Sequence, residues 1–129
     1  MSTLKTGKVK TTTIADELDT ESTAVTNVIN GSAKAWVTYN GATNTINGSF
    51  NVDSVTDHAT GQFSLNFTSG ALADGNYAYT SSNRNASAPN TVVGNHDTIV
   101  KTSSAFRIYA LVGAGSPTDF QDICVVIHR

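Results

Sequence analysis

The chain has 129 residues, of which 14% are charged, and a formal net charge of −2. This length fits one domain with a modest core, and the charged fraction is well below the roughly 25% usual for soluble domains. The lack of a long basic run argues against nucleic-acid binding, and no apolar run reaches the ~20 residues that span a membrane. The chain is rich in Ser, Thr, Asn and Gly, which favour strands and turns over helices.

The N-terminus lacks the apolar segment of a secretory signal, so we expect the chain to fold in a reducing cytoplasm. Its one cysteine, Cys124, cannot form an internal disulfide. It lies in the apolar run of residues 123–127 and is expected to be a small buried side chain.

Residues 1–30 are expected to form an N-terminal arm, because they are too polar to build a core alone. Ile14, Leu18, Val25 and Val28 fall near a heptad spacing and are therefore candidate oligomer contacts. A short helix over residues 13–21 is compatible with this pattern. An extended segment that pairs with another chain fits equally well, and so does disorder. The arm is thus a candidate anchor or oligomerisation element.

Residues 31–129 are expected to form one domain of short strands. Alternating apolar residues predict strands at 33–39, 62–68 and 105–112, with further strands at 44–52, 76–80, 98–101 and 120–128. The pair Asn47-Gly48 predicts a bulge, and residues 53–61 a turn-rich connection. Residues 81–97 are expected to be a long loop, in which Val92 and Val93 form a short strand or pin the middle. The strand at 120–128 has apolar residues on both faces and should be central.

Six to eight short strands with turn signals about every dozen residues favour an all-β fold, an antiparallel β-sandwich or small barrel. The arm would precede it as a short extended or partly helical segment. If Ala35 and Val37 face the core, Trp36 points outward or toward a second subunit. Its alternative roles are a core residue on the other side of the sheet or a ligand contact.

Catalytic and metal-binding patterns are weak in this sequence. The pairs Asp57-His58 and His96-Asp97 place a carboxylate beside an imidazole, but neighbouring residues of an extended chain point to opposite faces. A metal site built from these residues and Asp53 lacks a known ligand spacing. No glycine-rich phosphate loop is present, so neither a metal nor a cofactor is expected. We therefore expect the protein not to be an enzyme.

Four segments carry a resemblance to a known family: residues 30–41 (NGSAKAWVTYNG), 49–57 (SFNVDSVTD), 61–68 (GQFSLNFT) and 74–78 (DGNYA). They resemble a domain of tailed-bacteriophage tail fibres and related virion proteins, especially of phages that infect aquatic bacteria. The resemblance covers residues 30–80 well and the C-terminal third in outline. It implies a virion structural protein and carries over no activity and no site residues.

The resemblance and composition together predict a virion appendage, a homotrimeric short fibre or decoration protein on the head or tail. Its partners would be its own copies and other virion proteins such as capsid, portal or tail components. The alternative is a module that binds a host receptor or glycan, and its expected surface is Tyr77, Tyr79, Asn83, Arg84 and His96. A depolymerase that uses Asp53 and Asp57 ranks last, because the chain is short for that activity.

Overall fold

A computed structural model describes residues 13–15, 22–84, 91–96, 98–113 and 115–129. The chain divides into two compact units, Met1–Ser32 and Ala33–Arg129. The predicted arm ended at residue 30, two residues before this boundary.

The first unit contains a short hairpin and one helix. Strand β1 (Thr13–Ala15) pairs antiparallel with β2 (Ser22–Ala24), and helix α1 (Val25–Gly31) follows directly. Of the alternatives for residues 13–21, the helix does not hold for residues 13–15, which are extended, and residues 16–21 lie outside the described part. The observed helix begins where Val25, Val28 and Ile29 recur at the i, i+3, i+4 spacing of one helical face. The Ser32 N–H and hydroxyl close its last turn on the carbonyls of Val28 and Ile29, each at 3.0 Å.

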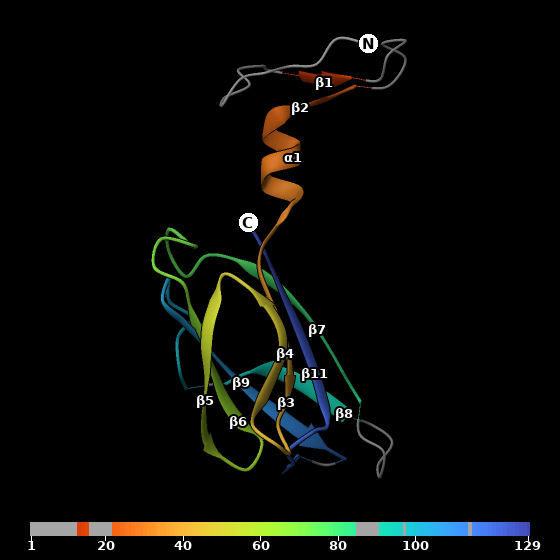
Figure 1. Cartoon of the computed structure of the whole chain (residues 1–129), viewed down its shortest axis with the longest axis vertical. Coiled ribbons are helices and arrows are strands. Elements are labelled where there is room, and N and C mark those ends of the chain that lie inside the picture. Colours follow the sequence, from red (N-terminus) through yellow and green to blue (C-terminus); the bar gives the residue numbers. More distant parts are fainter. Residues whose placement is uncertain (1–12, 16–21, 85–90, 97, 114) are drawn as a thin grey trace. The chain divides into compact units, whose positions relative to one another are not determined.

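The second unit is an all-β sandwich of two antiparallel sheets that pack against each other (Figure 1). One sheet has the order β4-β3-β11-β7, formed by β4 (Thr45–Phe50), β3 (Ala33–Asn40), β11 (Asp122–His128) and β7 (Ala78–Arg84). The other has the order β10-β9-β6-β5, with β8 also paired to β9. Its strands are β10 (Ser116–Pro117), β9 (Ala105–Val112), β6 (Gln62–Phe67), β5 (Val52–Ala59) and β8 (Thr91–Asn95). The central position predicted for the last strand is confirmed, because β11 lies between β3 and β7.

The core lies between the two sheets and is built from alternate residues of β3, β6, β9 and β11. Each of these strands buries every second side chain, as period-two patterning requires. Edge-to-face rings connect the two layers: the Tyr39 and Phe63 ring centres are 5.2 Å apart, and those of Tyr77 and Phe106 are 6.0 Å apart. Burial raises the pKa of Tyr39 to about 12, with smaller contributions from the carboxylates of Asp57 and Asp119.

Polar edge strands account for two differences from the sequence prediction. Residues 53–61, predicted as a connection, lie mostly in β5, which pairs with β6 along its length. The predicted loop 81–97 is wrong at its start, because β7 continues to Arg84. Of the two alternatives for Val92 and Val93 within it, the short strand is the one observed, as part of β8. Both β5 and β7 carry few apolar residues, so the backbone of the neighbouring strand rather than the pattern decides their structure.

The β4 region shows one confirmed prediction and one correction. Thr38 pairs with Gly48 and Tyr39 with Ile46, so Asn47 is the extra residue of the predicted bulge. The strand predicted over 44–52 is in fact interrupted at Asn51, which has φ 55°. The Asn51 side-chain amide donates to the Lys34 carbonyl at 2.7 Å and holds this corner, where the chain passes from one sheet to the other.

Residues 98–101, predicted as a strand, form irregular structure instead. The prediction that Cys124 is buried is also wrong. Its side chain is half-buried on the outer side of β11, because the core-facing positions of that strand are Ile123, Val125 and Ile127.

Candidate functional site

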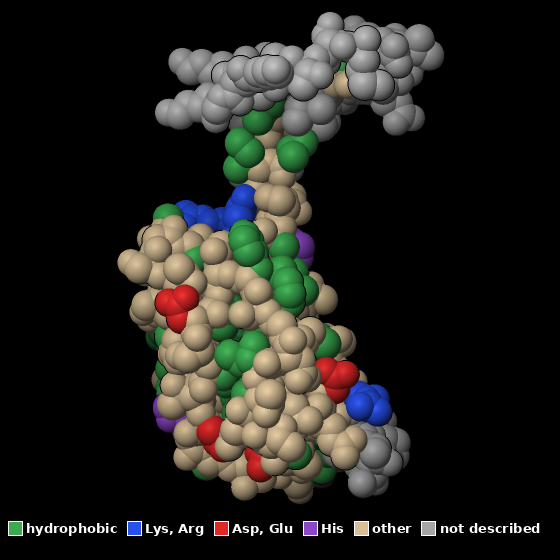
Figure 2. All heavy atoms as spheres, in the orientation of Figure 1, with side chains coloured by type: hydrophobic (Ala, Val, Ile, Leu, Met, Phe, Trp, Pro, Cys, Tyr) green, Lys and Arg blue, Asp and Glu red, His purple; other side chains and the backbone are tan. Residues whose placement is uncertain are grey.

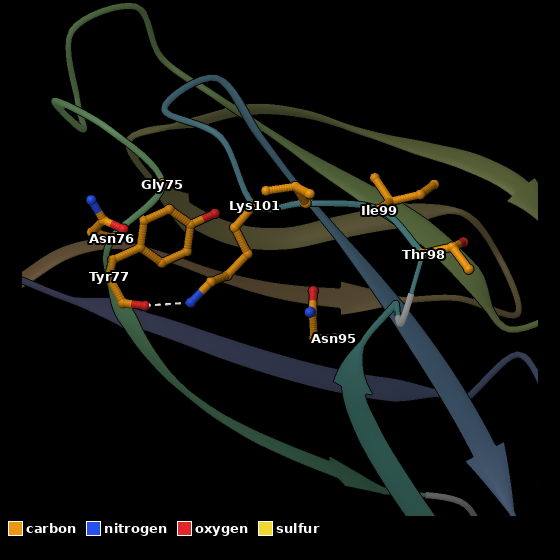
Figure 3. A pocket seen from close by; sticks show the side chains of 8 residues that line it. Gly75, Asn76, Tyr77, Asn95, Thr98, Ile99 and Lys101 are labelled. Atoms are coloured by element: carbon orange, nitrogen blue, oxygen red, sulfur yellow. Dashed lines mark hydrogen bonds between the residues drawn. The ribbon is translucent and has the colours of Figure 1, made fainter.

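A hollow of about 510 Å³ opens in the sandwich unit between the start of β7 and the segment after β8 (Figure 3). Its lining consists of Gly75, Asn76, Tyr77, Asn95, Thr98, Ile99, Val100 and Lys101. The volume lies within the range of small-molecule sites, which is about 300–1,000 Å³. The two lining segments are about 20 residues apart in sequence, and only the fold brings them together.

A close backbone contact at Gly75 brings the two lining segments together. A Cβ at this position would lie 2.1 Å from the Lys101 carbonyl oxygen, a distance that no side chain tolerates. Glycine is therefore required here for close approach rather than for an unusual φ. Any larger residue would push the segment of residues 99–101 away and change the shape of the hollow.

Lys101 is the cation of the hollow. Its ammonium donates a hydrogen bond to the Tyr77 main-chain carbonyl at 2.6 Å, and Figure 3 shows the two groups facing each other. The same ammonium lies 4.8 Å from the centre of the Tyr77 ring and 5.9 Å from that of Tyr79, so cation–π attraction also holds it. Among the described residues, no carboxylate forms an ion pair with it.

Tyr77 forms the floor of the hollow. Its side chain is 4% exposed and its hydroxyl donates to the Thr102 carbonyl at 3.4 Å. Burial raises the pKa of Tyr77 to about 12, so the phenol is neutral beside the Lys101 ammonium at physiological pH. Among the described residues that line the hollow, Lys101 carries the one formal charge, and that charge is positive.

Two carboxamides and an apolar rim complete the lining. The Asn95 N–H donates to the Tyr79 hydroxyl at 3.0 Å, which fixes the end of β8. The Asn95 side-chain amide has no partner within the described part of the chain, and it projects toward the space that Lys101 faces (Figure 3). Val100 is 81% exposed and forms the apolar rim with Ile99.

Among the described acidic residues, Asp74 lies closest in sequence to the lining of the hollow, because it directly precedes Gly75. Its carboxylate has partners of its own. It accepts hydrogen bonds from the Asn76 N–H at 2.7 Å and from the Arg129 guanidinium at 2.8 Å. These contacts, the Asn76 N–H first, hold the pKa of Asp74 below its ordinary value. The Arg129 ion pair offsets the charge of this carboxylate.

The predicted receptor surface is not assembled as a single patch. Tyr77 and His96 are buried, 4% and 8% exposed, so their expected exposure is wrong. Arg84 is exposed but lies seven residues from Tyr77 along an extended chain, about 20 Å away. Asn83 is half-buried and its side-chain oxygen accepts a hydrogen bond from the Thr91 hydroxyl at 2.5 Å. Tyr79 is half-buried and packs against Phe106 with the ring centres 4.7 Å apart and the ring planes tilted.

The histidines have structural contacts. The His96 ring stacks on Tyr109 at 4.2 Å, with the Thr98 hydroxyl at 3.1 Å from its Nδ1. His58 Nε2 lies 2.9 Å from the Ser64 hydroxyl on the neighbouring strand, a pair that the sequence spacing did not suggest. No carboxylate contacts His58 among the described residues, so the group that orients the imidazole in Ser–His catalysis is missing from this part of the chain.

The acidic residues considered for catalysis or metal binding are engaged separately. Asp53 accepts a hydrogen bond from the Thr68 hydroxyl at 2.5 Å, and Asp57 accepts one from the Asn44 amide at 2.9 Å. Across the described ranges, no three His, Cys, Asp or Glu side chains gather in a way that could hold a metal ion.

An exposed apolar pair marks the outer face of the β4-β3-β11-β7 sheet. Trp36 and Phe50 are direct cross-strand partners, 38% and 49% exposed. Val126 lies opposite Trp36 on the next strand and is half-buried. A Cβ at Gly48 would lie 3.3 Å from the Trp36 ring, so the indole covers that glycine. Trp36 thus points outward, as expected from the buried Ala35 and Val37 beside it.

The remaining predicted oligomer contacts belong to the first unit. Val28 is 43% exposed and Val25 is half-buried on α1, where Ile29 is 54% exposed. Ile14 lies in β1, and Leu18 lies outside the described residues.

Most of the visible surface of the sandwich unit is polar and uncharged, with few charged side chains (Figure 2). No helix within the described ranges is long and apolar enough to cross a membrane. Comparisons with known proteins gave no matching protein family, no matching curated protein and no matching solved structure.

Proposed function

We propose that this chain is a non-enzymatic structural protein of a bacteriophage virion, made in the host cytoplasm and assembled into the particle. It would form a homotrimeric fibre or decoration appendage, attached to the head or tail through the first unit. The resemblance of residues 30–80 to virion proteins supports this proposal. The low charge and the Ser-, Thr- and Asn-rich sandwich fit an appendage domain that relies on uncharged polar groups for solubility.

The observation that carries the proposal is the Trp36–Phe50 pair on the outer sheet face. Exposed aromatic side chains that lie side by side are more typical of protein interfaces than of free surfaces. Tryptophan in particular is enriched among residues that dominate binding energy. The half-buried Val126 extends this apolar row to a third strand, so the sheet face offers a continuous contact for a second copy.

Light scattering of the purified chain tests the proposal directly. We expect a trimeric mass for the full chain and a lower mass for Trp36→Ser. Val92→Ser is the matched control, because Val92 is 58% exposed on β8 of the other sheet and should leave the mass unchanged. A monomer at all concentrations, or equal behaviour of the two variants, would contradict the use of this face.

Deletion of residues 1–30 tests the arm separately. If these residues are the anchor, the truncated chain folds but no longer attaches to the particle. A trimer that survives the deletion would assign assembly to the sandwich, whereas loss of the trimer would assign it to the arm. Loss of folding in the truncated chain would contradict the anchor role.

The second candidate is host attachment through a surface saccharide, and the hollow around Lys101 favours it. Carboxamides, a hydroxyl and an apolar rim are the groups that saccharide hydroxyls and CH faces contact. Binding of a host polysaccharide by the full chain, measured by retention on an immobilised sample, tests it. An appendage that also contacts the host would need both the oligomer face and the hollow.

A further inference from the structure

We infer that the hollow lined by residues 75–77, 95 and 98–101 binds an acidic saccharide, with a sugar carboxylate on the Lys101 ammonium. The inference rests on the second proposed function and specifies its ligand class and its principal contact. It concerns the sandwich unit alone and does not depend on the oligomeric state.

The charge of the hollow favours an anion. Lys101 is half-buried, and its ammonium has one neutral carbonyl acceptor at 2.6 Å and two aromatic faces as partners. An ammonium carries three N–H donors, so the carbonyl leaves two of them for a ligand. No described carboxylate neutralises it, and the Asp74 carboxylate is already paired with Arg129. A ligand carboxylate would supply the missing countercharge in a partly desolvated position, where charge-assisted hydrogen bonds are strongest.

The other lining groups favour a saccharide over a bare ion. The Asn95 amide offers a donor and an acceptor that no described residue uses, and Asn76 lines the hollow from the other segment. Such groups match the paired hydroxyls of a sugar ring. Val100 and Ile99 give an apolar rim for the CH face of the ring. The volume of about 510 Å³ also exceeds what a single small anion would fill.

The hollow is fixed before a ligand arrives. Gly75 packs against the Lys101 carbonyl, the Lys101 ammonium holds the Tyr77 carbonyl, and the Tyr79 hydroxyl holds the Asn95 N–H. The three ties order both walls in the free protein. A ligand therefore loses little binding energy to ordering of the protein.

The test uses the full chain labelled with nitrogen-15, titrated with trigalacturonate and followed by NMR. We expect shifts of the side-chain amides of Asn95 and Asn76. The methyl ester of the same trisaccharide, which lacks the charge, should bind at least about tenfold more weakly, as expected for loss of one charge-assisted hydrogen bond. Inorganic phosphate serves as the bare anion and should give no comparable shifts.

Two variants test the assigned contact. Lys101→Met keeps the apolar stem beside the tyrosine rings, removes the charge and should weaken binding about tenfold or more. Asn95→Asp adds a negative charge at a side chain that has no described partner, so the fold should persist while trigalacturonate binding is lost. Arg84→Gln is the matched control, because it removes an equal charge at the far end of β7 and should change affinity less than about twofold. Thermal unfolding of each variant checks the fold.

Several results would overturn the inference. Equal affinity for the acid and its ester would favour a neutral saccharide, which keeps the second proposed function and rejects this one. Equal binding of phosphate would reduce the site to an anion site. Unchanged binding in Lys101→Met, or no binding of trigalacturonate at millimolar concentration, would reject the assigned contact.

Discussion

The turn between β5 and β6 allows a stability test with an internal control. Gly61 and Gly70 both have positive φ, +68° and +80°, so an alanine at either position would adopt a backbone that L-residues avoid. Their surroundings differ. A Cβ at Gly61 would lie 2.5 Å from the Ala110 carbonyl oxygen and 2.7 Å from the Thr118 nitrogen, whereas a Cβ at Gly70 would meet nothing within 4 Å.

Both substitutions carry the same conformational cost, because each places an alanine in a left-handed backbone conformation. A left-handed conformation costs a non-glycine residue roughly 1–2 kcal/mol, and the reduced freedom of the unfolded chain offsets about 0.4–1 kcal/mol of this. We therefore expect Gly70→Ala to lower the free energy of unfolding by about 0.5–1 kcal/mol.

Gly61→Ala adds a steric term, because backbone rather than a flexible side chain must move. Three hydrogen bonds meet at this point: Ala110 N–H to the Gly61 carbonyl at 2.8 Å, Thr118 N–H to the Ala110 carbonyl at 2.9 Å, and Gly61 N–H to Asp119 Oδ1 at 2.7 Å. Each contributes about 0.5–1.5 kcal/mol. Loss of two or three of them brings the expected total to about 3 kcal/mol.

Urea unfolding followed by circular dichroism, at one fixed protein concentration, measures both variants. The expected signature is a midpoint for Gly61→Ala well below that of Gly70→Ala, with equal slopes. Equal destabilisation within about 0.5 kcal/mol would refute the reasoning, since the crowding at Gly61 would then have no energetic consequence.

Three further predictions concern the core and the titratable groups. Tyr39 and Tyr77 have pKa values of about 12 in the folded protein, above the ordinary value of 10.0. As the pH rises the unfolded chain therefore loses these protons first, and the free energy of unfolding should fall between pH 10 and 12. Urea midpoints measured across this range check the direction of the change. Asp119→Ala removes the acceptor of the Gly61 N–H and should cost about 1–2 kcal/mol in the same urea assay. Asp122→Ala removes a carboxylate that lies 4.0 Å from the Arg84 guanidinium, with the two side chains 40% and 70% exposed, and should cost less than about 0.5 kcal/mol. Ile123→Ala opens a cavity at a side chain with 0% exposure and should lower the free energy of unfolding by about 2–5 kcal/mol, measured by thermal and urea unfolding.

The sequence predicted the strands whose apolar residues alternate without interruption. In β6 and β9 every second residue is buried, so the period alone locates the strand and its inner face. The same patterning predicted an outward position for Trp36 on the condition that Ala35 and Val37 face the core, and both are buried. The edge strand β5 buries only Val52, and its other residues are half-buried or exposed. Its structure depends on pairing with β6, which is a tertiary effect that residues 52–59 do not encode by themselves.

The helix α1 was missed for a different reason. Its seven residues include Thr, Asn and Gly, which have low helix propensity, and no side chain caps its N-terminus. The i, i+3, i+4 spacing of Val25, Val28 and Ile29 was present, but so short a repeat does not distinguish a helix from an extended segment. The pattern of residues 25–29 therefore indicated this helix less clearly than uninterrupted alternation indicated β6 and β9.

The hollow could be only partly predicted from the sequence. Tyr77 and Tyr79 share one face, as the alternation indicated, but that face is the inner one, so Tyr77 is buried and Tyr79 is half-buried rather than exposed. Alternation shows which residues share a face of a strand but not which face is buried. Because β7 has few apolar residues, packing against the second sheet decides which of its faces is buried. Once Phe106 packs against both rings, the segment of residues 98–101 passes over Gly75 and brings Lys101 beside them. A cation without a described carboxylate partner thus arises at a crossing of two segments, where no local motif could have indicated it.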